Sequence, residues 1–127
     1  MSLTIETLLE RAQQSKNDKF MMKKYKSKLL GGELTIVRQP LTKILSIIGD
    51  MDENRRDMVR MISVMCELIY VSVPLFRDKR LQKEYEVAEP YDVVQAVLND
   101  NVDEITELAE AIFEMYGLKE LKDKTKK

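Results

Sequence analysis

The chain has 127 residues, of which 44% are hydrophobic and 34% charged, and its formal net charge is −1. This composition is typical of one folded domain with an apolar core and excludes a disordered chain. The sequence contains no histidine and a single cysteine. A Ser-His-Asp triad, a Cys-His dyad, a histidine-ligated metal site and an internal disulfide are therefore excluded. We accordingly expect no cofactor and none of the familiar catalytic apparatus of an enzyme.

The near-zero net charge is the sum of two segments of opposite charge. Residues 11–43 contain nine Lys or Arg and two acidic residues, whereas residues 84–116 contain ten acidic residues and no Lys or Arg. The first interpretation, favoured because runs of charge are usually solvated surface, is two polar faces of one molecule. The second is a basic face and an acidic face that contact different partners or join copies of the chain head to tail.

The N-terminal residues predict a short amphipathic helix. Ile5, Leu8, Leu9 and Ala12 have the spacing of one helix face within residues 4–14. We treat residues 1–15 as this N-terminal helical segment, which the polar run SKNDK then interrupts.

A glycine pair marks the next predicted element. Gly31 and Gly32 separate a lysine-rich run from the β-branched run ELTIVR, and glycine adopts positive φ at a turn without steric cost. Residues 21–29 also fit a helix, but the glycine pair favours a β-hairpin with strands at 23–29 and 33–38.

Helices follow the hairpin. A helix that begins after Pro40 is expected to end at Gly49. The longest predicted element, residues 54–73, is apolar around much of its circumference and is expected to be the central core helix. Arg60 and Glu67 interrupt its apolar run, so it is too short to span a membrane.

The last predicted helix has clear signals at both ends. After two short helical segments, Asn101 is expected to be its N-cap, with Glu104 completing a capping box, and Gly117 to be the residue that ends it. The lysine-rich residues 118–127 are predicted to be a flexible tail. The predicted fold class is mainly α, a single helical domain over residues 1–127 with a short N-terminal β-hairpin.

Two groups of residues invite a chemical interpretation and are better explained structurally. Asp103, Glu107, Glu110 and Glu114 follow one side of the last helix, and carboxylate oxygens suit Mg²⁺ or Ca²⁺. These carboxylates lie opposite the apolar stripe, where a globular helix carries solvated charge, so we expect no metal site. Cys66 lies in the long apolar helix without a basic neighbour, which predicts a buried, unreactive thiol.

The basic stretch over residues 16–28 gives the alternative function. Its lysines suit phosphate contacts, and Phe20 and Tyr25 are interleaved with them, so binding to a nucleic acid is considered. Arg11 is the one arginine before the hairpin, and the isoelectric point is near 5.6. Both observations argue against a dedicated nucleic-acid-binding protein.

Eight methionines is a high number for a chain of this length. Methionine side chains adapt to irregular cores and to varied apolar partners. Met58, Met61 and Met65 lie on the long helix and are expected to fill the core, whereas Met21 and Met22 lie outside any core stripe. We therefore predict an exposed partner-binding surface near the start of the hairpin. Its residues are Phe20, Met21, Met22, Lys23, Lys24, Tyr25, Lys26 and Lys28.

Two stretches together resemble a known family. Residues 25–48 read YKSKLLGGELTIVRQPLTKILSII, and residues 68–118 contain VSVP, LQKEY, EPYDVV and a closing acidic helix that ends in YGL. This order of a basic hairpin, a Gln-Pro helix start and the later motifs resembles the XkdN-like tail assembly chaperones, small proteins of contractile-tailed phages and defective prophages.

The resemblance implies a non-enzymatic assembly factor. Such a protein binds the long tape-measure protein, keeps it soluble and extended, and helps tail-tube subunits to polymerise around it. The resemblance also implies a place in the cytoplasm of the bacterial host and absence from the mature virion. The expected partners are thus the tape-measure protein and the tail-tube protein, and the segregated charge adds self-association as a further expectation.

Overall fold

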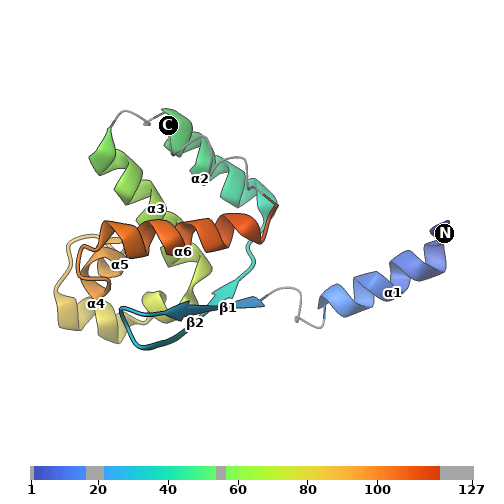
Figure 1. The fold of residues 1–127 in the computed structure, drawn as a ribbon, viewed down its shortest axis with the longest axis horizontal. Coiled ribbons are helices and arrows are strands. Elements are labelled where there is room, and N and C mark those ends of the chain that lie inside the picture. Colours follow the sequence, from blue (N-terminus) through green and yellow to red (C-terminus); the bar gives the residue numbers. More distant parts are fainter. Residues whose placement is uncertain (1, 17–21, 54–56, 118–127) are drawn as a thin grey trace.

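The computed structural model describes residues 2–16, 22–53 and 57–117 (Figure 1). A body of helices and one hairpin lies on one side, and the first helix stands apart from it. The mainly α fold class and the N-terminal hairpin are confirmed. The elements in chain order are α1 (Ile5–Lys16), β1 (Met22–Ser27), β2 (Gly32–Val37), α2 (Leu41–Glu53), α3 (Met58–Ser72), the 3-10 helix η1 (Pro74–Arg77), α4 (Lys79–Tyr85), α5 (Asp92–Val97) and α6 (Val102–Glu114).

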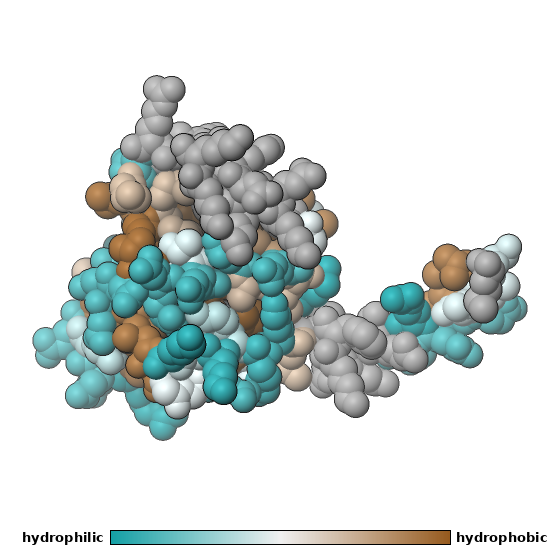
Figure 2. Space-filling model, in the orientation of Figure 1, coloured by the Kyte–Doolittle hydropathy of each residue, from teal (hydrophilic) through white to brown (hydrophobic). Residues whose placement is uncertain are grey.

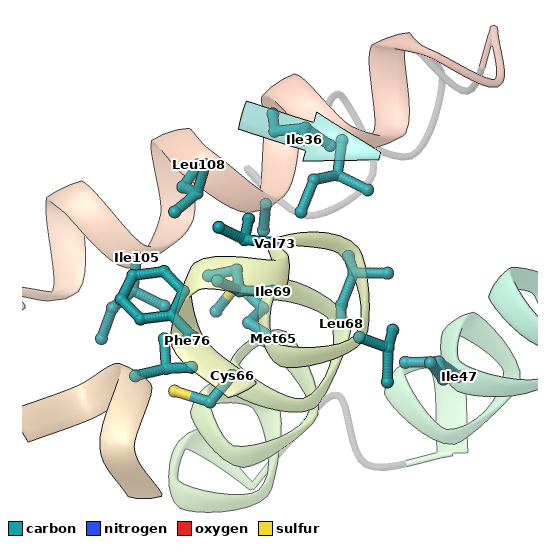
Figure 3. Close-up of a cluster of buried hydrophobic side chains, with 14 of the residues drawn as sticks. Ile36, Ile47, Met65, Cys66, Leu68, Ile69, Val73, Phe76, Ile105 and Leu108 are labelled. Atoms are coloured by element: carbon teal, nitrogen blue, oxygen red, sulfur yellow. The ribbon is translucent and has the colours of Figure 1, made fainter. Parts of the chain in front are cut away.

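Helix α3 is the centre of the body, as its all-round apolar character predicts. Helices α2, α5 and α6 and the 3-10 helix η1 contact it. Figure 3 shows Ile36 of β2, Ile47 of α2 and Leu108 of α6 converging on side chains of α3. Burial of a side chain of this size contributes about 1.5–3 kcal/mol. The buried residues of α3 are Val64, Met65, Cys66, Leu68, Ile69, Val71 and Ser72.

The start of α3 is set by its N-cap. Asp57 has an extended backbone, with φ −104° and ψ 100°, and its side chain accepts a hydrogen bond from the backbone N–H of Arg60 at 3.1 Å. This arrangement satisfies one of the free N–H groups of the first turn. The expected start at Asn54 lies outside the described residues, and the described helix begins at Met58.

The methionines of α3 have unequal environments. Met65 is buried and Met61 packs against the core, in agreement with the prediction. Met58 is 73% exposed, so its predicted core position is wrong. It lies on the first turn beside the exposed Val59, whereas the buried residues of this helix begin at Val64.

The hairpin pairs β1 with β2 in antiparallel register, from Met22 opposite Val37 to Ser27 opposite Gly32. Residues 28–31 form the turn, and Gly31 has φ +70°, a value that favours glycine. The glycine pair therefore divides, because Gly31 turns the chain and Gly32 starts the second strand.

Glycine residues were used to predict two helix ends, and the structure agrees with one of these predictions. Gly117 has φ +71° in the turn that follows α6, three residues after Glu114, so the helix ends close to the predicted glycine. Gly49 lies inside α2, which continues to Glu53, so the predicted end at Gly49 is wrong. A glycine inside a helix costs about 1 kcal/mol, which tertiary packing overrides. Buried Ile47 and Ile48 provide that packing in α2. The predicted tail, residues 118–127, lies outside the described residues.

Candidate partner-binding surface

The two faces of the hairpin have different environments. Met22, Lys24 and Lys26 of β1 are exposed, whereas Lys23, Tyr25 and Ser27 alternate with them and are at least partly buried. This alternation follows from the two-residue period of a strand. The buried face lies against α6, so the exposed face is the part of β1 that is open to a partner.

A buried carboxylate holds the inner face of the hairpin to α6. The Oγ of Ser27 donates a hydrogen bond to Oε1 of Glu104 at 2.7 Å, and the hydroxyl of Tyr25 lies 3.3 Å from the same oxygen. The backbone N–H of Leu30, in the turn, donates to Oγ of Ser27 at 3.1 Å. Because Glu104 is only 8% exposed, these hydrogen bonds stabilise a charge that would otherwise be costly to bury.

The expected capping box is therefore only half formed. Oδ1 of Asn101 accepts a hydrogen bond from the backbone N–H of Glu104 at 3.0 Å, so the predicted N-cap is confirmed. The backbone N–H of Asn101, which the Glu104 carboxylate would accept in a capping box, donates to the carbonyl of Leu98 at 3.0 Å. The carboxylate of Glu104 binds the hairpin instead.

The environment of Tyr25 keeps its hydroxyl protonated. Burial, together with the negative charges of Glu104 and Glu107, raises the pKa of Tyr25 to about 12. The phenol therefore remains a hydrogen-bond donor into the alkaline range, where an unperturbed tyrosine would ionise. Its ring is partly buried and packs against the core, and its hydroxyl faces α6.

A second contact anchors the opposite end of the hairpin. The hydroxyl of Tyr116 accepts a hydrogen bond from the N–H of Gln39 at 2.7 Å and lies 3.2 Å from the carbonyl oxygen of Gln39. The guanidinium of Arg38 donates to the carbonyl of Met115 at 3.2 Å and lies 4.9 Å from the centre of the Tyr116 ring. Cation–π contact adds to these hydrogen bonds. The turn end of the hairpin is thus fixed to α6, and the open end to the residues that directly follow α6.

The structure separates the predicted binding residues into three sets. Met22, at 44% exposure, and the three lysines 24, 26 and 28 face outward. The Nζ of Lys24 donates to Oγ1 of Thr35 across the hairpin at 2.8 Å. Lys23 and Tyr25 face α6, and Lys23 forms an ion pair with Glu114 at 3.4 Å. Phe20 and Met21 lie outside the described residues.

The position of Tyr25 in the hairpin affects the alternative function, binding to a nucleic acid. The alternative function requires an aromatic ring that stacks on a base beside the lysines. Tyr25 is partly buried against the core with its hydroxyl on Glu104, which limits the ring surface that a base could stack on.

The described part of α1 presents apolar side chains to solvent. The α1 stripe, defined as Ile5, Leu8, Leu9 and Ala12, is the predicted amphipathic face, and its three large side chains are 49–64% exposed. Figure 2 shows apolar atoms on the α1 arm, away from the body. Thr4 directly precedes the helix, and its Oγ1 accepts a hydrogen bond from the backbone N–H of Thr7 at 3.3 Å.

A groove beside the hairpin turn was not predicted from the sequence. It has a volume of about 490 Å³ and lies between the turn, η1 and α4. We call it the leucine groove, and its apolar lining is Leu30, Leu34, Leu75, Phe76, Leu81 and Val97. Its charged lining is Asp78, Arg80 and Glu84. The available signal was the pair Leu29 and Leu30, apolar residues in a turn where polar residues are usual.

Charges near this groove are partly paired. A hydrogen bond from Arg80 holds the pKa of the Asp78 carboxyl at about 2. The two side chains lie 2.7 Å apart, and that of Arg80 is 91% exposed. Arg80 can therefore contact an external acidic group as well as Asp78.

Three of the four acidic residues predicted to form a solvated face of α6 are exposed, and the fourth, Glu110, is half-buried. The exposed three are Asp103, Glu107 and Glu114. Within residues 2–16, 22–53 and 57–117, no group of three His, Cys, Asp or Glu is placed to hold a metal ion. In the same residues no helix is long and apolar enough to cross a membrane.

The single cysteine is buried, as predicted. Cys66 is 2% exposed, and burial raises the pKa of its thiol to about 12. The nearby charges of Asp92 and Asp100 act in the same direction. A thiol with so high a pKa is a poor nucleophile at neutral pH.

These features are those of a small α-helical protein that offers exposed apolar and charged surfaces to other proteins. Over residues 5–127 the chain matches the family described as phage XkdN-like tail assembly chaperone protein. The chain belongs to this family, and the resemblance recognised in its motifs is confirmed. Comparison with curated proteins and with solved structures gave no match. The family supports a role as a chaperone of phage tail assembly.

Proposed function

We propose that this chain binds the tape-measure protein of a contractile-tailed phage or prophage. In this proposal it keeps that partner soluble and extended while tail-tube subunits polymerise around it. The observation that carries the proposal is membership of the tail assembly chaperone family over residues 5–127. The protein acts without catalysis, in the cytoplasm of the bacterial host, and is absent from the mature virion.

Physical features of the surface support a protein partner. A long helical partner with apolar segments needs adaptable apolar side chains to cover them. Met22 on the hairpin and the α1 stripe are apolar and exposed. Lys24 and Lys26 follow Met22 on the exposed face of the same strand, and Lys28 is exposed in the turn beyond it. These lysines favour a partner segment that carries acidic residues.

We assign the partner-binding surface to the outer face of β1 together with the residues that precede it. Phe20, Met21 and Met22 provide apolar contact, and Lys24, Lys26 and Lys28 provide charge. Lys23 and Tyr25 act indirectly, because their contacts with α6 position the strand.

Co-expression with the tape-measure protein of the same genome tests this function. We expect soluble tape-measure protein that co-purifies with the chain, and insoluble tape-measure protein when it is expressed alone. Failure to form a complex, together with salt-sensitive binding of the chain to DNA, would favour the nucleic-acid alternative.

Paired substitutions test the assigned surface. Met21→Asp with Met22→Asp is expected to abolish co-purification without lowering the melting temperature. Leu41→Asp is the matched control, because Leu41 is similarly exposed at the first turn of α2 and an acidic residue is tolerated there. A large fall in melting temperature of the double variant would show that the methionines belong to the core.

A further inference from the structure

We propose that the cleft between the start of α3 and the start of α6 is a second partner-binding site, which takes apolar side chains from a helical segment of the tape-measure protein that carries Lys or Arg beside them. The identity of the partner rests on the proposed function, whereas the chemistry of the bound segment rests on the cleft itself. The apolar lining of the cleft, its size and the charges around it point to this occupant.

The first turns of two helices form the cleft. Met58 begins α3 and Val102 begins α6. Because α3 packs against α6, these two helix starts lie at the same edge of the body (Figure 1). We call this feature the α3–α6 cleft, and its apolar lining is Met58, Val59, Ile62, Val102 and Ile105.

The apolar side chains of the α3–α6 cleft are open to solvent. Met58 and Val59 are 73% and 76% exposed, and Val102 is 49% exposed. Figure 2 shows apolar atoms at this edge of the body. The first turn of a helix is usually enriched in acidic residues, but α3 has none in its first turn. Exposed apolar side chains that line a cleft are typical of a surface that binds another protein.

The volume of the α3–α6 cleft indicates the kind of occupant. It is about 210 Å³, which is smaller than the roughly 300–1,000 Å³ of a typical small-molecule site. Adaptable methionine and branched aliphatic side chains line it, and such a lining suits one or two apolar side chains of a protein partner. A row of apolar residues on a partner helix therefore fits this cleft better than a small ligand does.

The carboxylates around the cleft give it a negative charge. Asp100 lines the cleft, and exposed Asp103 lies on the first turn of α6. Burial, and then the charges of Asp92 and Asp100, raise the pKa of the Cys66 thiol. Cys66 lies one turn beyond Ile62 on α3, so these two carboxylates act on the side of α3 that lines the cleft.

The helices that form the cleft carry little positive charge. Residues 84–116, which include α5 and α6, contain no Lys or Arg. The one cation of α3 is Arg60, which is two positions from Met58 and therefore lies on another face of the helix. Arg55 and Arg56, which precede α3, lie outside the described residues. A partner segment with Lys or Arg beside its apolar residues is thus favoured over an acidic one.

The turn that carries Asp100 holds this carboxylate in place. Asn99 and Asp100 have φ values of +54° and +56°, in the left-handed region that Asn and Asp tolerate best after glycine. The backbone N–H of Asp100 donates to the carbonyl of Gln95, which also lines the cleft, at 2.9 Å. A carboxylate on such a turn is positioned in advance to meet a cation of the partner.

The α3–α6 cleft and the hairpin lie on different sides of α6. Glu104 binds the hairpin through Ser27, whereas Val102 and Ile105 line the cleft, and residues one or two positions apart on a helix point in different directions. The chain thus presents a positive surface on the hairpin and a negative one at the cleft. Two segments of opposite charge on one long partner can therefore bind the same chain, which strengthens the complex without any further contact.

Titration of labelled peptides tests the proposal. The probes are overlapping synthetic peptides that cover the tape-measure protein of the same genome, and their fluorescence anisotropy is followed as the purified full chain is added. We expect the peptides that bind to include one with an apolar helical face flanked by Lys or Arg. Val59→Ser with Val102→Ser is expected to raise the dissociation constant of that peptide by at least about tenfold. Leu41→Ser is the matched control and should bind as the unmodified chain does, because Leu41 is 49% exposed on the first turn of α2, away from the cleft.

Removal of one carboxylate tests the role of charge. Asp100→Asn keeps a residue that tolerates the left-handed conformation, and it is expected to weaken binding of the same peptide about two- to fivefold at low salt. This difference should diminish at high salt. Glu33→Gln, which removes an exposed carboxylate of β2, is the control and should leave binding unchanged. Equal binding by the unmodified chain, the double valine variant and Asp100→Asn would overturn the proposal.

Photo-crosslinking in the co-purified complex identifies the occupant. Val59→Cys carries a benzophenone maleimide, and Cys66 is buried and does not compete for the label. We expect crosslinks to a segment of the tape-measure protein that contains Lys or Arg. Crosslinks only to a second copy of the chain, or only to another protein, would overturn the assignment of the occupant.

Failure of this inference and failure of the proposed function are separate results. If the unmodified chain binds no part of the tape-measure protein, the proposed function fails. If it binds and the cleft variants leave every dissociation constant unchanged, this inference fails and the proposed function stands. Val59 and Val102 are exposed, so the melting temperature of the double variant should be unchanged, which verifies that the body remains folded.

Discussion

Loss of the contact between Ser27 and Glu104 is expected to lower the stability of the fold. Ser27→Ala removes a hydroxyl that donates to the buried carboxylate at 2.7 Å and accepts from the N–H of Leu30 at 3.1 Å. A hydrogen bond to a charged group is worth about 1.5–3 kcal/mol and a neutral one about 0.5–1.5 kcal/mol. We therefore expect Ser27→Ala to lower the free energy of unfolding by about 2–3 kcal/mol.

A double-mutant cycle separates this contact from the general effect of each substitution. Ser27→Ala, Glu104→Ala and the combination are unfolded with urea and followed by far-UV circular dichroism. We expect a coupling energy of about 1–2 kcal/mol, because the two residues share a hydrogen bond. Asp103→Asn is the matched control at an exposed carboxylate of the same helix turn, and should change stability by about 0.5 kcal/mol.

Two results would refute the reasoning. One is a free energy of unfolding for Ser27→Ala that lies within about 0.5 kcal/mol of that of the unmodified protein, which would mean that water replaces the hydroxyl. The other is additivity of the two substitutions within about 0.3 kcal/mol, which would mean that the groups do not interact.

Three further predictions follow from the described contacts. The pKa of Tyr25 is raised to about 12 in the folded protein, so the stabilising contribution of its hydroxyl is complete below about pH 10 and is lost as the pH rises toward 12. Urea titrations should therefore show that the difference in free energy of unfolding between the unmodified protein and Tyr25→Phe shrinks over that interval. A constant difference would contradict the prediction. Cys66 is buried, so a thiol reagent at neutral pH should label it only after denaturant is added, and rapid labelling of the native protein would contradict its burial. Asn101→Ala removes the N-cap of α6 and should cost about 1 kcal/mol in thermal unfolding, whereas Asn101→Asp should retain most of that stability.

Capping residues in the sequence predicted those helix ends that depend only on residues close by in the chain. Asn101 caps α6 as predicted, because an N-cap needs only its own side chain and the next three N–H groups. Gly117, with its positive φ, lies in the turn that follows the helix. The N-cap at Asp57 was missed, although an Asp before an apolar run is such a signal. Gly49 gave the opposite error, because the packing of α2 outweighs the preference of glycine for a helix end.

The proposed binding residues show the limit of reading a strand from its sequence. The eight predicted residues were consecutive or nearly so, but alternation along β1 turns Lys23 and Tyr25 toward α6 and leaves Met22, Lys24 and Lys26 outside. Periodicity predicts that a strand has two faces, whereas the position of α6 decides which face is buried.

The sequence by itself determined the helical class, the hairpin, the central helix and the amphipathic α1, because each depends on periodicity or on turn residues within one segment. Only the tertiary structure decided what Glu104 does and where the leucine groove lies. Glu104 contacts Ser27, which is 77 positions away in sequence, and the groove joins the hairpin turn to η1, α4 and Val97. Such contacts depend on how the elements pack in space, and no local pattern in the chain specifies that packing.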